Sequence, residues 1–214
     1  MISFHNDEDA RFLEFVNHSY ENELSDRSRK LIYYKRDKER DFAILSLFLG
    51  SGIRMNELSN LRLRDLDFEE KQIHVLRKGG KKDVVAVSPP SMQDIKDYLA
   101  VRTERIGAQM TIPAYIFLTR VNDGATPLSN RAIEALVKKY TKAFKSNKSM
   151  SPHKLRHTYW TNLIEQSGDI HLLMTQLGHT STTTAALYTN PEQEKAKKAA
   201  KLLGERRTNY REKD

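Results

Sequence analysis

The sequence has no cysteine, no long apolar run and no glycine-rich nucleotide loop. Without cysteine the chain cannot form disulfides or a thiolate metal site, which fits a reducing cytoplasm. No apolar stretch approaches the roughly 20 residues of a membrane span, and the N-terminus lacks the basic and then apolar pattern of a secretory signal. The histidines are not spaced as a metal cluster, so we expect no metal and no cofactor.

What the sequence has in excess is positive charge. There are 36 Lys and Arg against 28 Asp and Glu, a net charge of +8, while 38% of the residues are hydrophobic and 30% are charged. This composition is typical of a soluble globular protein, and the excess charge favours a polyanionic partner such as DNA. A merely basic soluble protein would have the same composition, so charge alone does not decide the partner.

The hydrophobic pattern predicts a mainly α-helical chain with a small antiparallel β-hairpin, an α+β fold. The dense apolar run 41–49 is typical of a helix buried nearly all round, broken at Gly50-Ser51-Gly52. Alternating apolar residues predict a hairpin over 72–88 with a two-residue turn at Gly79-Gly80, ended by Pro89-Pro90. Further helices are expected at 91–106, from Ser129 to 144, from Ser151 onward and at 192–203.

The stretch from Ser151 to Asn190 concentrates residues suited to phosphodiester chemistry. His153 and Arg156 are three apart and share one helix face, His179 follows a predicted glycine stop, and Tyr188 lies near the end. Arginine matches phosphate oxygens in fork geometry. Histidine can donate to those oxygens or move a proton, and tyrosine is a competent nucleophile. The inward face of the first helix carries Leu155, Tyr159 and Leu163.

Two basic residues upstream lie at positions that suit an anion. Arg54 follows the glycine break, near a helix N-terminus where free N–H groups already point. Lys78 lies at the tip of the predicted hairpin, from which a cation can enter a DNA groove. Each has an ordinary explanation as well: an arginine paired with a neighbour such as Glu57, and a plain basic hairpin that holds a phosphate.

Together these motifs resemble the tyrosine recombinases, also called the phage integrase family. The resemblance covers about residues 41–190 and rests on S-G-I-R-M-N-E-L, R-K-G-G-K-K-D-V-V-A-V, H-K-L-R-H and L-G-H, with a tyrosine nine residues on. Arg77 and Ala86 stand where the family usually has glycine and proline, so Lys81 is the alternative to Lys78. The matched positions, in family order, are Arg54, Lys78, His153, Arg156, His179 and Tyr188.

The resemblance implies the tyrosine recombinase catalytic-domain fold and a site-specific DNA recombinase that needs neither metal nor nucleotide. Tyr188 would attack the scissile phosphate, forming a 3′-phosphotyrosyl link and releasing a 5′-hydroxyl. His153 is then the candidate base for the tyrosine proton, and Lys78 the candidate acid for the leaving oxygen.

The other matched residues act on the charge of the phosphate. Arg54 and Arg156 would neutralise the non-bridging oxygens in the transition state, the dominant catalytic term in phosphoryl transfer. His179 would add a hydrogen bond, and Glu57 is interpreted as a structural orienter.

The predicted organisation has three parts: a lead-in over 1–40, a catalytic domain over 41–190, and a C-terminal helix and tail over 191–214. Full-length family members usually carry an N-terminal helical domain, so we expect the chain to be the catalytic domain of a longer recombinase. The resemblance implies double-stranded DNA as partner, a homo-oligomer (a tetramer on DNA) that exchanges the C-terminal helix, and a nucleoid-associated cytoplasmic location. The alternative for that helix is packing on its own domain.

Two other functions are compatible with parts of the pattern. The pattern of residues 170–188 resembles a helix–glycine turn–helix motif, so a non-catalytic DNA-binding module is one alternative. Such a module has no need for His153, Arg156, His179 and Tyr188 together. A topoisomerase IB-like enzyme, which nicks and reseals without exchanging partners, is the other alternative and uses similar chemistry.

Overall fold

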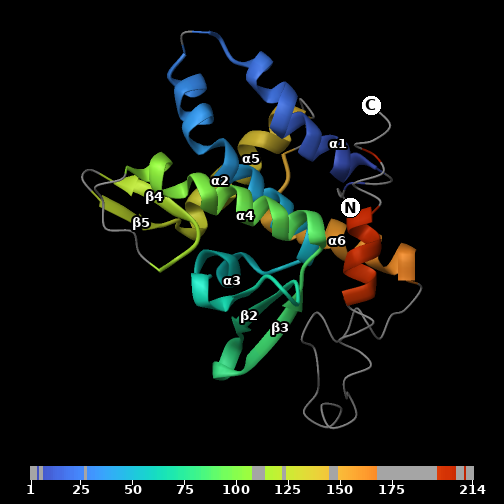
Figure 1. The fold of residues 1–214 in the computed structure, drawn as a ribbon. Helices are drawn as coiled ribbons and strands as arrows, with labels where there is room; N and C mark the ends of the chain where they lie inside the picture. The colour runs from blue at the N-terminus through green and yellow to red at the C-terminus, as the bar shows by residue number, and fades with distance from the viewer. Residues whose placement is uncertain are drawn as a thin grey trace, which may run out of the picture.

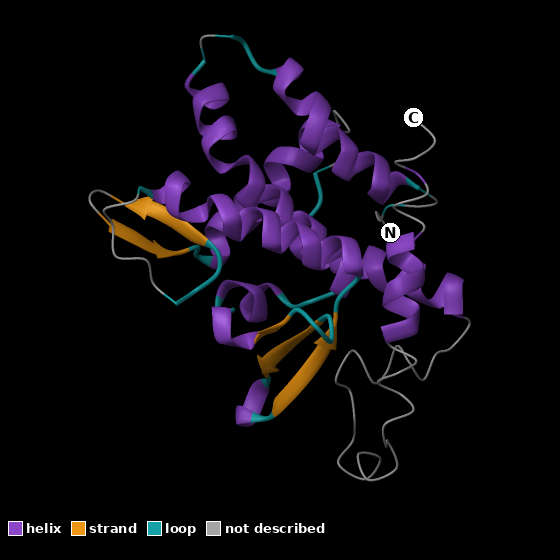
Figure 2. Cartoon of the chain, viewed as in Figure 1, coloured by secondary structure: helices purple, strands orange, loops and turns teal. Residues whose placement is uncertain are grey.

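The computed structural model describes residues 4, 7–26, 28–107, 114–121, 124–144, 149–167, 197–205 and 210. Within these ranges the chain is mainly helical with two small antiparallel sheets, which confirms the predicted fold class (Figure 1, Figure 2). No helix in this part of the chain combines the length and apolar character that crossing a bilayer requires.

Six α-helices are bounded within the described residues: α1 (Glu8–Glu14), α2 (Arg29–Ser51), α3 (Met55–Ser59), α4 (Pro89–Ile106), α5 (Asn130–Phe144) and α6 (Pro152–Ser167). The strands are β1 (Leu66–Asp67), β2 (Gln72–Leu76), β3 (Lys82–Ala86), β4 (Leu118–Val121) and β5 (Gly124–Pro127). Short helical turns are η1 (Phe15–Ser19), η2 (Tyr20–Glu23), η3 (Leu63–Asp65) and η4 (Lys78–Gly80).

Helix α2 is the central element, and its second half is buried from residue 41 to residue 51. The buried helix expected over 41–49 is therefore confirmed, but it starts earlier and ends later. It begins after the N-cap Ser28, whose side chain accepts from the Leu31 N–H at 3.2 Å. It ends at Gly52, with φ of 60°, and not at Gly50. The predicted segment boundary between residues 40 and 41 falls inside this helix.

Glycine is needed at position 50 because α4 crosses α2 at close range (Figure 1). A Cβ at Gly50 would lie 2.0 Å from the Ser91 Oγ. In the same contact the Ser91 hydroxyl donates to the Ser46 carbonyl at 2.8 Å. The helix break predicted at Gly50-Ser51-Gly52 therefore falls at Gly52, and Gly50 serves helix packing.

The N-terminal segment joins the same core. Phe4 and Phe12 lie with ring centroids 5.0 Å apart, and Phe12 packs against Phe144 of α5 at 5.5 Å. The Phe4 N–H donates to the Thr158 hydroxyl of α6 at 3.1 Å. These contacts bury aromatic surface of the N-terminal segment in the same cluster as α5 and α6.

The predicted hairpin is present as β2 and β3, with Ile73 opposite Val85 in an antiparallel register. Its turn differs from the expected two-residue form. The Arg77 N–H donates to the Lys81 carbonyl at 2.8 Å, so three residues, Lys78–Gly80, form the connection. Pro89-Pro90 open α4, capped by Ser88, because proline suits the first helical turn.

A second hairpin, β4 with β5, was not predicted. Its strands have four residues each and include polar residues and Pro127, so the alternation is weak. Val121 is paired with Gly124, and residues 122 and 123 between them lie outside the described residues.

Helix α6 buries the predicted stripe, with Leu155, Tyr159 and Leu163 no more than 1% exposed. Beside it lies a helical segment at 197–205, drawn in red next to the orange α6 (Figure 1). The two helices and β3 bury one small cluster consisting of Ala86, Tyr159, Trp160, Leu163, Ala199, Ala200 and Leu203. The C-terminal apolar strip therefore packs on its own chain in this structure.

Candidate active site

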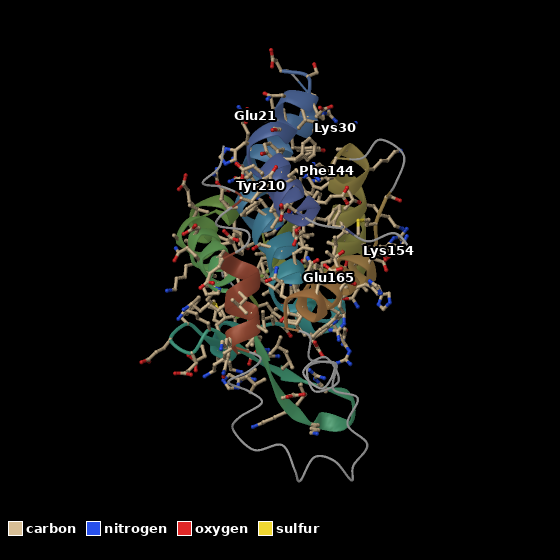
Figure 3. The ribbon with its side chains drawn as sticks, turned by 90° about the vertical axis from the view of Figure 1, so that its right-hand side faces the viewer. Glu21, Lys30, Phe144, Lys154, Glu165 and Tyr210 are labelled. Atoms are coloured by element: carbon tan, nitrogen blue, oxygen red, sulfur yellow. The ribbon has the colours of Figure 1, made fainter. Side chains whose placement is uncertain are left out.

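A cleft of about 410 Å³ lies where the starts of α3 and α6 meet α5. The structure brings three of the six predicted site residues to it: Arg54, His153 and Arg156. Arg54 comes from the start of α3, and the other two from the first turns of α6, whose beginning is marked by Lys154 in Figure 3. The remaining lining residues are Ile53, Met55, Glu134, Ser151 and Pro152.

Arg54 is held by Glu57 in two ways. Its backbone N–H donates to Glu57 Oε2 at 3.0 Å, and its Nη1 donates to Glu57 Oε1 at 3.0 Å. The carboxylate is 6% exposed, whereas the Arg54 side chain is 38% exposed. Glu57 therefore orients a guanidinium that remains open to the cleft.

Arg156 is buried, with 8% of its surface exposed. Its Nη1 donates to the Gly52 carbonyl, and its guanidinium lies 5.2 Å from the centroid of the Trp160 ring. Gly52 is required here twice over. Its φ is 60°, and a Cβ would lie 2.4 Å from Tyr159 Cδ1. The end of α2 thus supplies the carbonyl that aims Arg156.

The cleft carries an excess of positive charge. Burial, together with the nearby cations Arg54 and Arg77, lowers the pKa of Arg156 to about 10, whereas Glu57 opposes this shift. Guanidinium groups that repel one another in a partly buried site are stabilised when an anion enters. The electrostatics therefore favour a phosphate or similar group at this position.

The other predicted residues are placed as follows. His153 is exposed on the first turn of α6 and lines the cleft. Lys78 opens the turn η4 between β2 and β3. His179 and Tyr188 lie outside the described residues. Within the described ranges no three His, Asp or Glu side chains gather as a metal site would require.

Sequence reasoning missed three contributors to the geometry. Arg77 was noted only as a departure from a family pattern, yet it pairs with Asp83 at 2.9 Å. The signal was available, since the two residues lie diagonally across the same hairpin, where Asp83 is paired with Val75. Trp160, one helical turn after Arg156, could also have been found from spacing. The Gly52 carbonyl could not, because 104 residues separate it from Arg156.

A model of the phage integrase family matches residues 14–195. The chain is 40% identical over 200 residues to the tyrosine recombinase XerS of Lactococcus lactis subsp. cremoris (strain MG1363), covering 94% of this chain and 55% of that protein. It is 37% identical over 200 residues to XerS of Streptococcus gordonii, with the same coverage. The chain thus spans about half the length of these relatives.

Solved structures show the same fold at lower identity. The crystal structure of XerA recombinase superimposes with a TM-score of 0.60 at 24% identity, covering 91% of this chain and 63% of that one. The XerH site-specific recombinase bound to a palindromic difH substrate gives 0.64 at 21% identity, covering 92% and 51%.

Proposed function

Because the chain belongs to the phage integrase family, we propose that it acts as a tyrosine-type site-specific recombinase on double-stranded DNA. Cleavage and rejoining would proceed through a 3′-phosphotyrosyl intermediate. The supporting observation is the cleft in which Arg54, His153 and Arg156 meet with an excess of positive charge. We assign catalysis to residues 41–190.

In the first step the phenolic oxygen of Tyr188 attacks the scissile phosphorus. A bond forms between tyrosine and phosphorus, and the bond from phosphorus to the 5′ oxygen breaks. The tyrosine proton passes to His153, and the leaving 5′ oxygen takes a proton from Lys78. In the second step a 5′-hydroxyl from another strand returns a proton to Lys78 and attacks the phosphotyrosine, while the bond from phosphorus to tyrosine breaks and the phenolic oxygen takes its proton back from His153. Because the covalent link conserves the phosphodiester bond energy, no nucleotide cofactor is consumed.

Arg54 and Arg156 stabilise the transition state by holding the non-bridging oxygens, with His179 donating a further hydrogen bond. Both guanidinium groups are oriented before DNA arrives, Arg54 by Glu57 and Arg156 by the Gly52 carbonyl. Such preorganised donors avoid reorganisation during the reaction. Losing one donor of this kind typically costs roughly 3 kcal/mol, about a hundredfold in rate.

A nicked DNA substrate tests the proposal, because the short leaving strand diffuses away and traps the covalent adduct. Candidate half-sites are used in place of the natural target site. They are screened first for protein binding at low salt, because phosphate contacts dominate the affinity for DNA. We expect a protein–DNA adduct that survives denaturing electrophoresis and is absent in Tyr188→Phe. No adduct at any bound site would contradict the proposal and favour the DNA-binding module.

Relaxation and recombination separate the two enzymatic alternatives. A topoisomerase IB-like enzyme relaxes a single supercoiled plasmid without exchanging partners. A recombinase joins two sites, and its products show exchanged flanking sequences. We expect exchanged products in this assay. In the cell, we propose that the substrate is chromosomal DNA in the bacterial cytoplasm.

We also propose that the active assembly is a tetramer on DNA that exchanges the C-terminal segment between subunits. The strip formed by Ala199, Ala200 and Leu203 packs against α6 of its own chain. The same apolar strip suits the equivalent surface of a second copy. If removal of residues 192–214 leaves both the oligomeric state on DNA and the fold unchanged, the exchange is excluded.

A further inference from the structure

Arg77 is a buried cation at the end of β2, with its side chain 9% exposed. Its Nε lies 2.9 Å from Asp83 Oδ2 and 3.9 Å from Glu57 Oε1. Burial of a guanidinium is costly unless carboxylates or other acceptors compensate it. The two carboxylates come from different elements, β3 and α3, so the pairings join those elements.

Glu57 connects Arg77 to the cleft. Its Oε1 lies 3.0 Å from Arg54 Nη1 and 3.9 Å from Arg77 Nε. One carboxylate oxygen therefore faces both arginines, and Glu57 itself is 6% exposed. A shift of Arg77 changes the charge that Glu57 balances, and with it the orientation of Arg54.

Arg77 also fixes the turn that carries Lys78. Its N–H donates to the Lys81 carbonyl at 2.8 Å, and its carbonyl accepts from the Gly80 N–H at 3.1 Å. Asp83 lies on the facing strand, paired with Val75. The backbone of Arg77 closes the turn, while its side chain reaches to α3. Lys78 is the next residue in the chain.

We infer that Arg77 is a positioning residue that couples the Lys78 turn to Arg54 through Glu57. This inference rests on the proposed function, in which Lys78 protonates the leaving oxygen and Arg54 holds the phosphate. The coupling places proton donor and phosphate binder in fixed relation, instead of leaving the hairpin tip to move independently. The inferred position is the one where the family pattern usually has glycine, so the coupling is a property of the side chain present here.

Arg77→Met in the full chain is the primary test, because methionine keeps much of the length and removes the charge and fork. We expect the adduct to form about 10- to 100-fold more slowly at saturating nicked DNA, since misplacement by an ångström costs up to ~100-fold. The dissociation constant for DNA should change less than threefold. Arg77→Lys keeps the charge but not the fork, and should give an intermediate rate.

Arg105→Met is the matched control. Arg105 is also a partly buried arginine paired with a carboxylate, with Nη2 2.8 Å from Glu39 Oε1, and does not line the cleft. Its adduct rate should equal that of the wild type. An unchanged rate in Arg77→Met, or an equal loss in Arg105→Met, would overturn the inference.

Amide hydrogen exchange provides a readout that does not need activity. The Gly80 and Arg54 N–H groups are both hydrogen bonded, to Arg77 and to Glu57 respectively. In Arg77→Met both should exchange faster, while amides of α2 remain unchanged. If the wild type forms no adduct, the proposed function fails, and unchanged exchange at both amides separately overturns the coupling. Should Arg77→Met not fold, Asp83→Asn is measured instead, with the same outcomes.

Discussion

Two clusters of buried charge in this molecule are built on opposite plans. Around Asp41, which is 1% exposed, Arg40 Nη2 lies at 2.7 Å, Lys139 Nζ at 3.0 Å, and the Tyr140 hydroxyl donates at 2.9 Å. Around Arg156, the donated hydrogen bond in the described part of the chain goes to a neutral carbonyl, that of Gly52. The first cluster is compensated internally, whereas in the second Glu57 offsets the repulsion between the arginines only in part.

The direction of the pKa shifts expresses the same difference. Burial alone raises the pKa of Asp41, but Arg40 and Lys139 outweigh it and hold the pKa below its ordinary value. For Arg156, burial and the neighbouring arginines together lower the pKa to about 10. The surroundings of Asp41 stabilise its charge, which indicates a structural role. The surroundings of Arg156 destabilise its charge, which indicates a site for an external anion.

Asp41→Asn should have the largest effect on stability. It removes the charge that compensates two cations, and breaking a buried pair by removing one partner costs about 3–5 kcal/mol. We expect that loss in the free energy of unfolding, measured by urea denaturation at pH 7. Asp97→Asn is the matched control, because Asp97 is exposed on α4, and it should change stability by less than ~0.5 kcal/mol.

The acid limb of the same measurement has a definite sign. The pKa of Asp41 is lower in the folded protein than its ordinary value of 3.8. The folded state therefore binds fewer protons than the unfolded state, and stability falls as pH falls through this window. The difference between wild type and Asp41→Asn should shrink below pH 3.8. A difference that stays constant down to full protonation would show that charge is not its cause.

Arg156→Met should leave stability nearly unchanged and reduce activity. Methionine fills similar space, and relief of a destabilised charge offsets the lost hydrogen bond, so we expect unfolding within about 1 kcal/mol of the wild type. The rate of adduct formation should fall by roughly a hundredfold or more, from loss of one preorganised donor. Loss of several kcal/mol of stability would place Arg156 with Asp41, as a structural charge.

Local features of the fold and of the cleft could be predicted from the sequence alone. The stripe of Leu155, Tyr159 and Leu163 was predictable because helical period and apolar burial are local. Arg54 and Arg156 were identified from motifs, each beside a recognisable helix start. Their supports were harder to find, because the Gly52 carbonyl reaches Arg156 only after a long chain segment has folded.

Other features depended on packing that no local pattern contains. Arg77 meets Glu57 of α3 through the fold, and the turn after Arg77 has three residues and not the two expected from Gly79-Gly80. The strip formed by Ala199, Ala200 and Leu203 packs on α6 and β3, which are distant from it in sequence. The predicted helix break includes Gly50 because the sequence does not reveal that Ser91 packs closely against this position.

The smallest effect, and the most direct test of an unfilled charge, is stabilisation by inorganic phosphate. A ligand that binds only the folded state stabilises by mass action, by about 1 kcal/mol at fivefold excess over its dissociation constant. Phosphate also stabilises proteins by general exclusion from their surface, but that contribution is equal in all variants.

We therefore compare the free energy of unfolding in phosphate with that in chloride, at matched ionic strength. The gain in phosphate should be larger in the wild type than in Arg156→Met. Asp41→Asn should keep the wild-type gain, since its cluster faces no cleft residue. Equal gains in all three proteins would mean that the arginine cleft has no affinity for phosphate, and the distinction between the two charge clusters would then rest on pKa direction alone.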